Sequence, residues 1–226
     1  MTKRIKCAAF VAAATVFGCA VMAIVDGIIS PSYVVKSAVK IVIFAGIPIL
    51  FALMFDNDAV KTYLLPQKNG LFLSLSIGIA IYALIVGGYF ALSAVFDFSA
   101  VTSSLTSGEG VTRDNFLYVA AYISICNSFL EEFFFRGFAF HTLSRYIGRG
   151  AANVFSAISF AVYHVAIMSG WFSPLLFVLL VIGLFAGGII FNCLDMKTGD
   201  IYPSWIVHMF ANLATNTVGC VLFGIL

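Results

Sequence analysis

Three short segments place polar side chains inside otherwise apolar runs of the sequence. Each segment pairs two residues at a spacing of four, which brings them to one face of an α-helix. The pairs are Glu132 and Arg136 in EEFFFR, Phe160 and His164 in FAVYH, and His208 and Asn212 in HMFAN, with Glu131 directly before the first pair. Carboxylates and imidazoles transfer protons, and amides can donate to a developing negative charge. The segments therefore predict a reactive site, provided that helices bring them together.

The two glutamates of the first segment differ in their expected partners. An ionised residue at the centre of a membrane-spanning helix costs about 2.5–3.5 kcal/mol on an insertion scale. Glu132 lies four residues before Arg136, and this order favours an ion pair along the helix. Glu131 points about 100° away from that pair and has no basic residue one helical turn away. Glu131 is therefore the predicted general base, while Glu132 and Arg136 could be a clamp between helices.

The histidines extend this to a hydrolytic site. If Glu131 and His164 hold a water molecule, then His208 and Asn212 can stabilise the negative charge on an attacked carbonyl group. Such a site hydrolyses amides, and a peptide bond is the expected target. Phe160 is expected to pack beside His164.

A zinc site is the alternative to metal-free catalysis. The sequence contains no HExxH, so the compact arrangement of soluble zinc peptidases is absent. Glu131, His164 and His208 could nevertheless supply the carboxylate and two imidazoles of a catalytic zinc site. We favour a glutamate mechanism without metal or other cofactor, and keep zinc as the alternative.

The composition places these segments in a membrane protein. Of the 226 residues, 62% are hydrophobic and 10% are charged, and the mean hydropathy is +1.07. Soluble domains are typically about 45–50% apolar. The net charge is only +2, with no basic block, which argues against a nucleic acid partner. A polytopic protein in contact with a lipid bilayer is expected.

Runs without charged residues predict about seven transmembrane helices, and so an all-α helix bundle. A span needs about 20 apolar residues. The runs are 7–25, 41–55, 69–96, 115–130, 150–194 and 201–226. The fifth run is too long for one helix, and SGWFSP at 169–174 is expected to divide it. Residues 1–25 resemble a signal peptide, but their apolar stretch is longer than such signals use, so an uncleaved span is favoured.

Two further expectations concern the organisation of the bundle. Residues 1–114 should form about three transmembrane helices outside the motifs, and residues 115–226 a catalytic core of four helices. Gly183 and Gly187 have a GxxxG spacing, which predicts close helix packing there.

Basic residues predict that the N-terminus is cytoplasmic. This orientation puts eight of them in the cytoplasm: Lys3, Arg4, Lys6, Lys61, Lys68, Arg145, Arg149 and Lys197. It leaves three outside, Lys36, Lys40 and Arg113. Because Lys36 and Lys40 fall at the outer end of the second span, they are expected to extend their ammonium groups to the membrane surface.

The three segments together resemble the motifs EExxxR, FxxxH and HxxxN of the CPBP family, which comprises CAAX prenyl endopeptidases, bacteriocin-processing proteins and Abi proteins. The resemblance covers about residues 115–226. It implies an intramembrane endopeptidase in which Glu131 activates water with the help of His164. It also implies that His208 and Asn212 stabilise the oxyanion and that Glu132 and Arg136 support the site. The family is often labelled as metalloproteases.

The resemblance does not identify one substrate. Family members process prenylated CAAX proteins, or act in peptide maturation, bacteriocin immunity or signalling. Short loops suggest a compact bacterial-type enzyme of the cytoplasmic membrane, acting on a membrane-associated protein or peptide precursor. The oligomeric state is open. A membrane protein that binds peptides or confers immunity without catalysis is the main alternative. A proton-coupled transporter is less favoured because paired repeats and matching broken helices are not evident.

Overall fold

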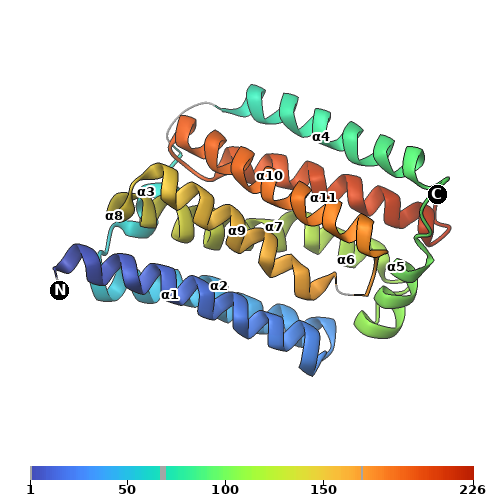
Figure 1. The fold of residues 1–226 in the computed structure, drawn as a ribbon, viewed down its shortest axis with the longest axis horizontal. Coiled ribbons are helices and arrows are strands. Elements are labelled where there is room, and N and C mark those ends of the chain that lie inside the picture. The colour runs from blue at the N-terminus through green and yellow to red at the C-terminus, as the bar shows by residue number, and fades with distance from the viewer. Residues whose placement is uncertain (1, 67–69, 169) are drawn as a thin grey trace.

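The computed structural model describes residues 2–66, 70–168 and 170–226, and all the regular secondary structure in these ranges is helical (Figure 1). The all-α prediction is thus confirmed. The first half of the chain forms α1 (Lys3–Ile24), η1 (Val25–Ile29), α2 (Tyr33–Phe55), α3 (Ala59–Leu64), α4 (Leu71–Leu92), α5 (Ser99–Ser103) and η2 (Ser104–Gly108). The second half forms α6 (Phe116–Tyr122), η3 (Ile123–Asn127), α7 (Ser128–Glu131), η4 (Glu132–Thr142), α8 (Leu143–Ile147), α9 (Arg149–Ile167), α10 (Pro174–Thr198) and α11 (Tyr202–Leu222).

Six described helices are long and apolar enough to cross a membrane: Lys3–Ile29, Tyr33–Phe55, Leu71–Leu92, Arg149–Ile167, Pro174–Thr198 and Tyr202–Leu222. The span expected at 115–130 is instead the first half of a longer helical segment, 116–147, which we call the motif helix. Its charged residues keep it out of the apolar set. The total of seven spans therefore stays a prediction.

The motif helix alternates between α-helical and π-helical turns. Elements η3 and η4 have π-helical hydrogen bonding, and Glu131 and Glu132 lie where α7 passes into η4. Segments of π-helix often accompany functional sites. The motif helix ends at Ile147 because Gly148 has a φ of +90°, which only glycine adopts readily. The chain then reverses into α9.

The helices form layers around the motif helix. In Figure 1, α1 and α2 lie on one side of α9 and the motif helix, α10 and α11 lie on the other side, and α4 is outermost. The two ends of the chain lie at opposite ends of the long axis. The motif helix contacts α2, α9, α10 and α11, so residues on several of its faces can meet other helices.

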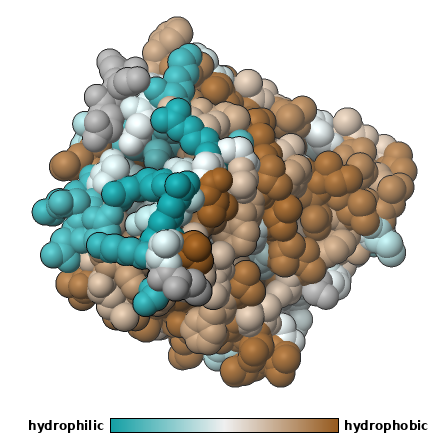
Figure 2. All heavy atoms as spheres, turned by 60° about the vertical axis from the view of Figure 1, so that its left-hand side comes forward, coloured by the Kyte–Doolittle hydropathy of each residue, from teal (hydrophilic) through white to brown (hydrophobic). Residues whose placement is uncertain are grey.

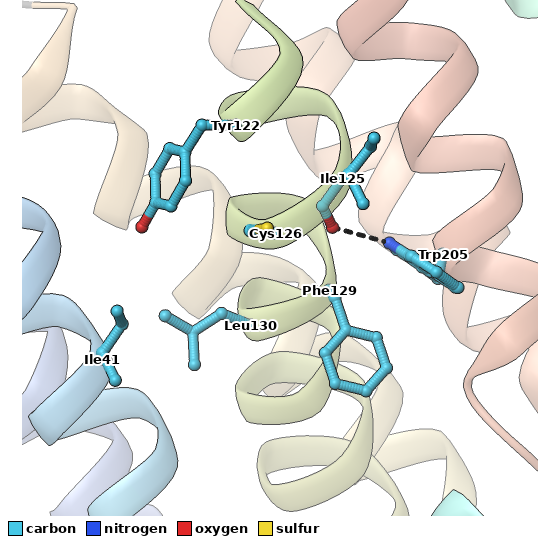
Figure 3. Close-up of a pocket in the computed structure, with 7 residues that line it drawn as sticks. All are labelled: Ile41, Tyr122, Ile125, Cys126, Phe129, Leu130 and Trp205. Atoms are coloured by element: carbon cyan, nitrogen blue, oxygen red, sulfur yellow. Dashed lines mark hydrogen bonds between the residues drawn. The ribbon is translucent and has the colours of Figure 1, made fainter. Parts of the chain in front are cut away.

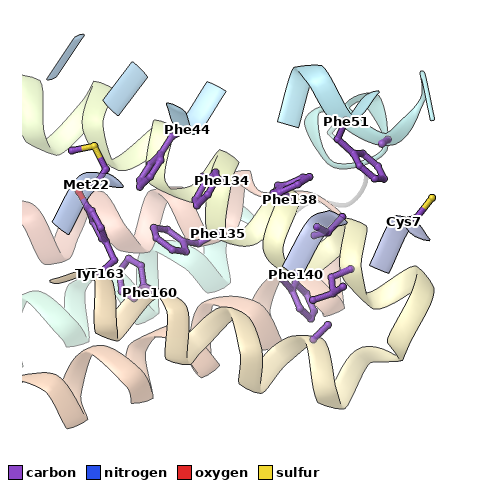
Figure 4. Close-up of a cluster of buried hydrophobic side chains, with 14 of the residues drawn as sticks. Cys7, Met22, Phe44, Phe51, Phe134, Phe135, Phe138, Phe140, Phe160 and Tyr163 are labelled. Carbon is purple, nitrogen blue, oxygen red and sulfur yellow. The ribbon is translucent and has the colours of Figure 1, made fainter. Parts of the chain in front are cut away.

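Aromatic side chains fill the core between α2, α9 and the motif helix (Figure 4). Phe44 of α2 stacks on Phe134 at a centroid distance of 4.2 Å and an interplanar angle of 3°. Phe135 meets Phe44 edge to face at 5.5 Å. These phenylalanines are fully buried, and they therefore pack between helices instead of facing lipid.

Hydrophilic side chains gather at one end of the molecule, where α1 begins (Figure 2). Arg4 donates from Nε to the carbonyl oxygen of Tyr146 at 2.8 Å, and Arg145 pairs with Asp56 at 2.7 Å. These contacts join the start of α1 and the end of α2 to α8. Lys68, which was counted as cytoplasmic, lies outside the described residues. These hydrophilic side chains lie at the end of the molecule that is predicted to be cytoplasmic. The membrane orientation itself stays a prediction.

Close helix packing occurs at glycines other than the GxxxG pair. A Cβ atom added to Gly183 or Gly187 would meet no described atom within 4 Å, so the predicted packing there is wrong. A Cβ on Gly188 would lie 3.0 Å from the backbone of Ala157 in α9. On α4, a Cβ on Gly78 would lie 2.5 Å from the ring of Phe210. The spacing indicated small residues, but not which of them faces a neighbour.

Gly78 and Gly88 give a matched test of how α4 packs on α11. Gly78→Ala should destabilise the protein by about 1–3 kcal/mol because the methyl group overlaps the Phe210 ring. Gly88→Ala, on the same helix, meets open space and should leave stability unchanged or raise it, since alanine is the better helix former. Thermal unfolding midpoints in detergent measure both. Equal midpoints for the two variants would contradict this packing.

Candidate active site

Glu131 lies at the meeting point of three helices. Its Oε2 atom is 3.7 Å from Nε2 of His164 on α9 and 3.8 Å from Nε2 of His208 on α11. Glu131 and His208 are buried, and the His164 side chain is 17% exposed. The structure thus brings together three of the four side chains that the sequence proposes as catalytic.

The other ring nitrogen of each histidine has a fixed partner. Nδ1 of His164 is 2.8 Å from the carbonyl oxygen of Phe160, and Nδ1 of His208 is 2.8 Å from Oε1 of Glu132. Both partners accept hydrogen bonds, so Nδ1 is the protonated nitrogen in each ring. A neutral imidazole then presents its lone pair at Nε2. Two imidazole lone pairs and one carboxylate oxygen therefore face the same small space, which suits a water molecule that donates to them.

Glu132 forms the ion pair that the spacing predicts. Its Oε2 lies 3.1 Å from Nε of Arg136, and both side chains are fully buried. The pair is close but not aligned as a hydrogen bond, and the guanidinium nitrogens have no hydrogen-bond partner among the described residues. Instead the guanidinium lies 4.1 Å from the ring centroid of Phe160 and 4.8 Å from that of Phe191. The ring faces stabilise this charge away from water.

Phe160 has the packing role that the sequence suggests. Its ring meets that of His164 at 4.5 Å and that of His208 at 5.8 Å, in both cases edge to face. The guanidinium of Arg136 lies over the same ring. Phe160 therefore contacts the arginine and both imidazoles, and its packing restricts their orientation.

Asn212 lies one turn after His208, but its amide has a structural partner. Nδ2 donates to the carbonyl oxygen of Ile123 at 3.2 Å, about two turns before Glu131 on the motif helix. This bond ties α11 to the motif helix. The amide carries a second N–H, so one donor remains for another acceptor.

Lys40 is the site residue that sequence reasoning missed. Its Nζ lies 3.3 Å from Oε1 of Glu131 and 2.8 Å from Oδ1 of Asn127. Glu131 has no basic residue one turn away on its own helix, as the sequence shows, but in the folded protein Lys40 of α2 supplies a cation. A lysine in the apolar run of α2 was the available signal, because a charge at that depth must face protein or water.

Lys36 also points inward instead of reaching the membrane surface. Its Nζ lies 2.6 Å from Glu109 and 3.6 Å from Asp26, and the residue is buried. The expected extension of Lys36 and Lys40 to the surface is therefore wrong for both. Carboxylates on neighbouring segments give these ammonium groups partners inside the protein.

The donors around Glu131 match zinc in type but not in arrangement. Two imidazoles and a carboxylate are a common catalytic zinc set. Within residues 2–66, 70–168 and 170–226, however, no group of three or more His, Cys, Asp and Glu side chains could hold a metal ion as arranged.

An apolar groove of about 340 Å³ is lined by residues of α2, α11 and the motif helix (Figure 3). Ile41 lines it from α2, and Trp205 lines it from α11, with its Nε1 donating to the carbonyl oxygen of Ile125 at 3.2 Å. The remaining lining residues come from the motif helix: Tyr122, Ile125, Cys126, Phe129 and Leu130. Ile41 follows Lys40 and Leu130 precedes Glu131 along the chain, although neither Lys40 nor Glu131 lines the groove.

Comparison with known proteins assigns the segment that holds the motifs. Residues 113–214 match the family model of Rce1-like type II CAAX prenyl endopeptidases. This segment is under half of the chain, and it contains Glu131, His164, His208 and Asn212. No curated protein and no solved structure matches the chain. The six apolar helices make it an integral membrane protein. The match over residues 113–214 supports the resemblance of this segment to the CPBP family of CAAX-type intramembrane proteases.

Proposed function

We propose that this protein is an intramembrane endopeptidase in which Glu131 and His164 activate a water molecule. The observation that supports this is the convergence on Oε2 of Glu131, which faces Nε2 of His164 at 3.7 Å and Nε2 of His208 at 3.8 Å. These separations are too long for direct hydrogen bonds. A water molecule between the three atoms could donate to two of them and keep its lone pairs free for attack.

The proposed reaction follows from these positions. Glu131 accepts a proton from the water through Oε2, while the water oxygen bonds to the carbonyl carbon of the scissile peptide bond. The carbonyl oxygen takes up the negative charge of the tetrahedral intermediate. When the C–N bond breaks, the proton held by Glu131 passes to the leaving nitrogen. The products are a carboxylic acid and an amine, and Glu131 returns to its starting form.

His208 and Asn212 are the proposed oxyanion donors. Because Nδ1 of His208 donates to Glu132, Nε2 becomes a donor when it also carries a proton. Asn212 uses one N–H on Ile123 and can offer the other. Arg136 in turn balances the charge of Glu132, which supports its proposed role outside the reacting atoms.

The groove supports a substrate that is apolar near the cleaved bond. Its lining is almost wholly hydrophobic, and Leu130 in that lining directly precedes Glu131 in the chain. We therefore propose a membrane-associated protein or peptide precursor, cleaved near the membrane interface. Both a CAAX-type C-terminus and a bacteriocin- or signal-peptide-like precursor have this character.

Glu131→Gln should abolish cleavage. The substitution keeps the shape of the side chain but removes the base, and positioned bases contribute roughly 10²–10⁴-fold to rate. We expect substrates to accumulate uncleaved in membrane peptidomes of cells that carry the variant. Asp58→Asn is the matched control, because Asp58 is an exposed acid remote from the site.

The peptidome comparison also separates the proposed functions. If Glu131→Gln is expressed normally and leaves the peptidome unchanged, the protein is not the protease proposed here. A peptide-binding or immunity protein would in that case retain its function in the variant. A proton-coupled transporter would instead show a pH-coupled flux in proteoliposomes.

Chelation tests the metal-free mechanism. We expect 1,10-phenanthroline or EDTA to leave the cleavage rate of the purified protein within twofold. Elemental analysis should find well under one zinc per chain. Stoichiometric zinc, together with loss of activity on chelation and recovery on zinc addition, would instead assign Glu131, His164 and His208 as zinc ligands. His164→Ala serves as the control, because it should lower activity with or without chelator.

A further inference from the structure

The two oxygens of the Glu131 carboxylate have different surroundings. Oε1 accepts hydrogen bonds from Nζ of Lys40 at 3.3 Å and from Nδ2 of Asn127 at 2.9 Å. Oε2 faces the two imidazole nitrogens. One oxygen is thus held by donors, while the other is left to accept a proton.

Lys40 and Asn127 also fix each other. Nζ of Lys40 donates to Oδ1 of Asn127 at 2.8 Å, which leaves Nδ2 of that amide to donate to Glu131. The ammonium group lies 5.2 Å from the ring centroid of Tyr163, and the Lys40 side chain is 13% exposed. The three polar groups form a closed triangle in a mostly buried place, so each has little freedom to reorient.

A second buried lysine lies one turn away on α2 and has ion-pair partners of its own. Lys36 lies four residues before Lys40 and pairs with Glu109 and Asp26. Glu109 follows η2, and Asp26 lies in η1, so the partners of Lys36 lie outside α2 and the motif helix.

We propose that Lys40 is a positioning residue for catalysis: with Asn127 it holds Oε1 of Glu131, and so directs Oε2 toward the attacking water. A carboxylate that could rotate would present either oxygen at varying angles, and a misplaced catalytic group can lower rates about 10²-fold. Lys40 lies outside residues 113–214, which match the family model. The N-terminal helices therefore contribute directly to the site. This inference rests on the proposed function of Glu131.

The competing explanation is that Lys40 only neutralises a buried charge. In that case its loss lowers stability but leaves the turnover of the folded protein unchanged. If Lys40 positions Glu131, its loss should instead lower the kcat of the folded protein. KM should change little, because the substrate does not bind to Lys40. Arginine keeps the charge and the donors, so Lys40→Arg should recover much of what Lys40→Met loses.

The test measures kcat and KM on purified full-length variants, using a fluorogenic peptide that spans a cleavage site mapped by the peptidome comparison. We expect Lys40→Met to lower kcat 10- to 100-fold with KM within twofold, and Lys40→Arg to retain at least a third of kcat. Lys36→Met is the matched control, since it removes a buried, paired lysine one turn away. Its kcat per folded protein should stay within twofold.

Two results overturn the inference. One is a Lys40→Met variant with unchanged kcat while Glu131→Gln is inactive, which leaves the proposed function intact. The other is an equal loss of kcat in Lys36→Met and Lys40→Met. If Glu131→Gln is itself active, the proposed function fails first. Asn127→Leu gives an independent measurement, with a fall in kcat expected, and it decides the question if Lys40→Met does not fold.

Discussion

Pairing of buried charges across helices is the constraint on which the rest of this structure depends. Glu131 and Glu132 are adjacent and buried. Glu131 has its cation on another helix, whereas Glu132 has partners both on its own helix and on another. Glu131 pairs with Lys40 of α2, and Glu132 pairs with His208 of α11 and with Arg136. Removing one partner of a buried pair costs about 3–5 kcal/mol. The two carboxylates therefore fix the positions of α2 and α11 against the motif helix.

The same pairing gives the two adjacent carboxylates different chemistry. Both oxygens of Glu132 are engaged, Oε1 by His208 and Oε2 by Arg136. Glu131 has one engaged oxygen and one that faces the imidazoles. A step of one residue turns a side chain by about 100° on a helix, which is enough to move it from one set of neighbours to another. This explains how a glutamate pair can combine a structural residue with a candidate base.

The sequence predicted the contacts that depend on spacing along one helix. Among contacts between helices it predicted the approach of Glu131, His164 and His208, but missed others. The Glu132–Arg136 pair and the packing of Phe160 on His164 follow from a separation of four residues. The contact of Lys40 with Glu131 spans 91 positions, so local spacing carries no sign of it. The close packing predicted at Gly183 and Gly187 was wrong for the same reason, because the spacing does not tell which face of the helix meets a neighbour. The membrane spans were predicted well, except where the motif helix carries its own charges.

Helix α2 links the groove to the carboxylate. Ile41 lines the groove, and the preceding residue, Lys40, holds Oε1 of Glu131. On the motif helix, Leu130 lines the groove and Glu131 follows it. A rigid helix cannot move one of two adjacent residues without the other. Any change in the spacing of α2 and the motif helix therefore alters both the width of the groove and the hold on the carboxylate. Apolar contact in the groove and the orientation of the candidate base thus both depend on the distance between α2 and the motif helix.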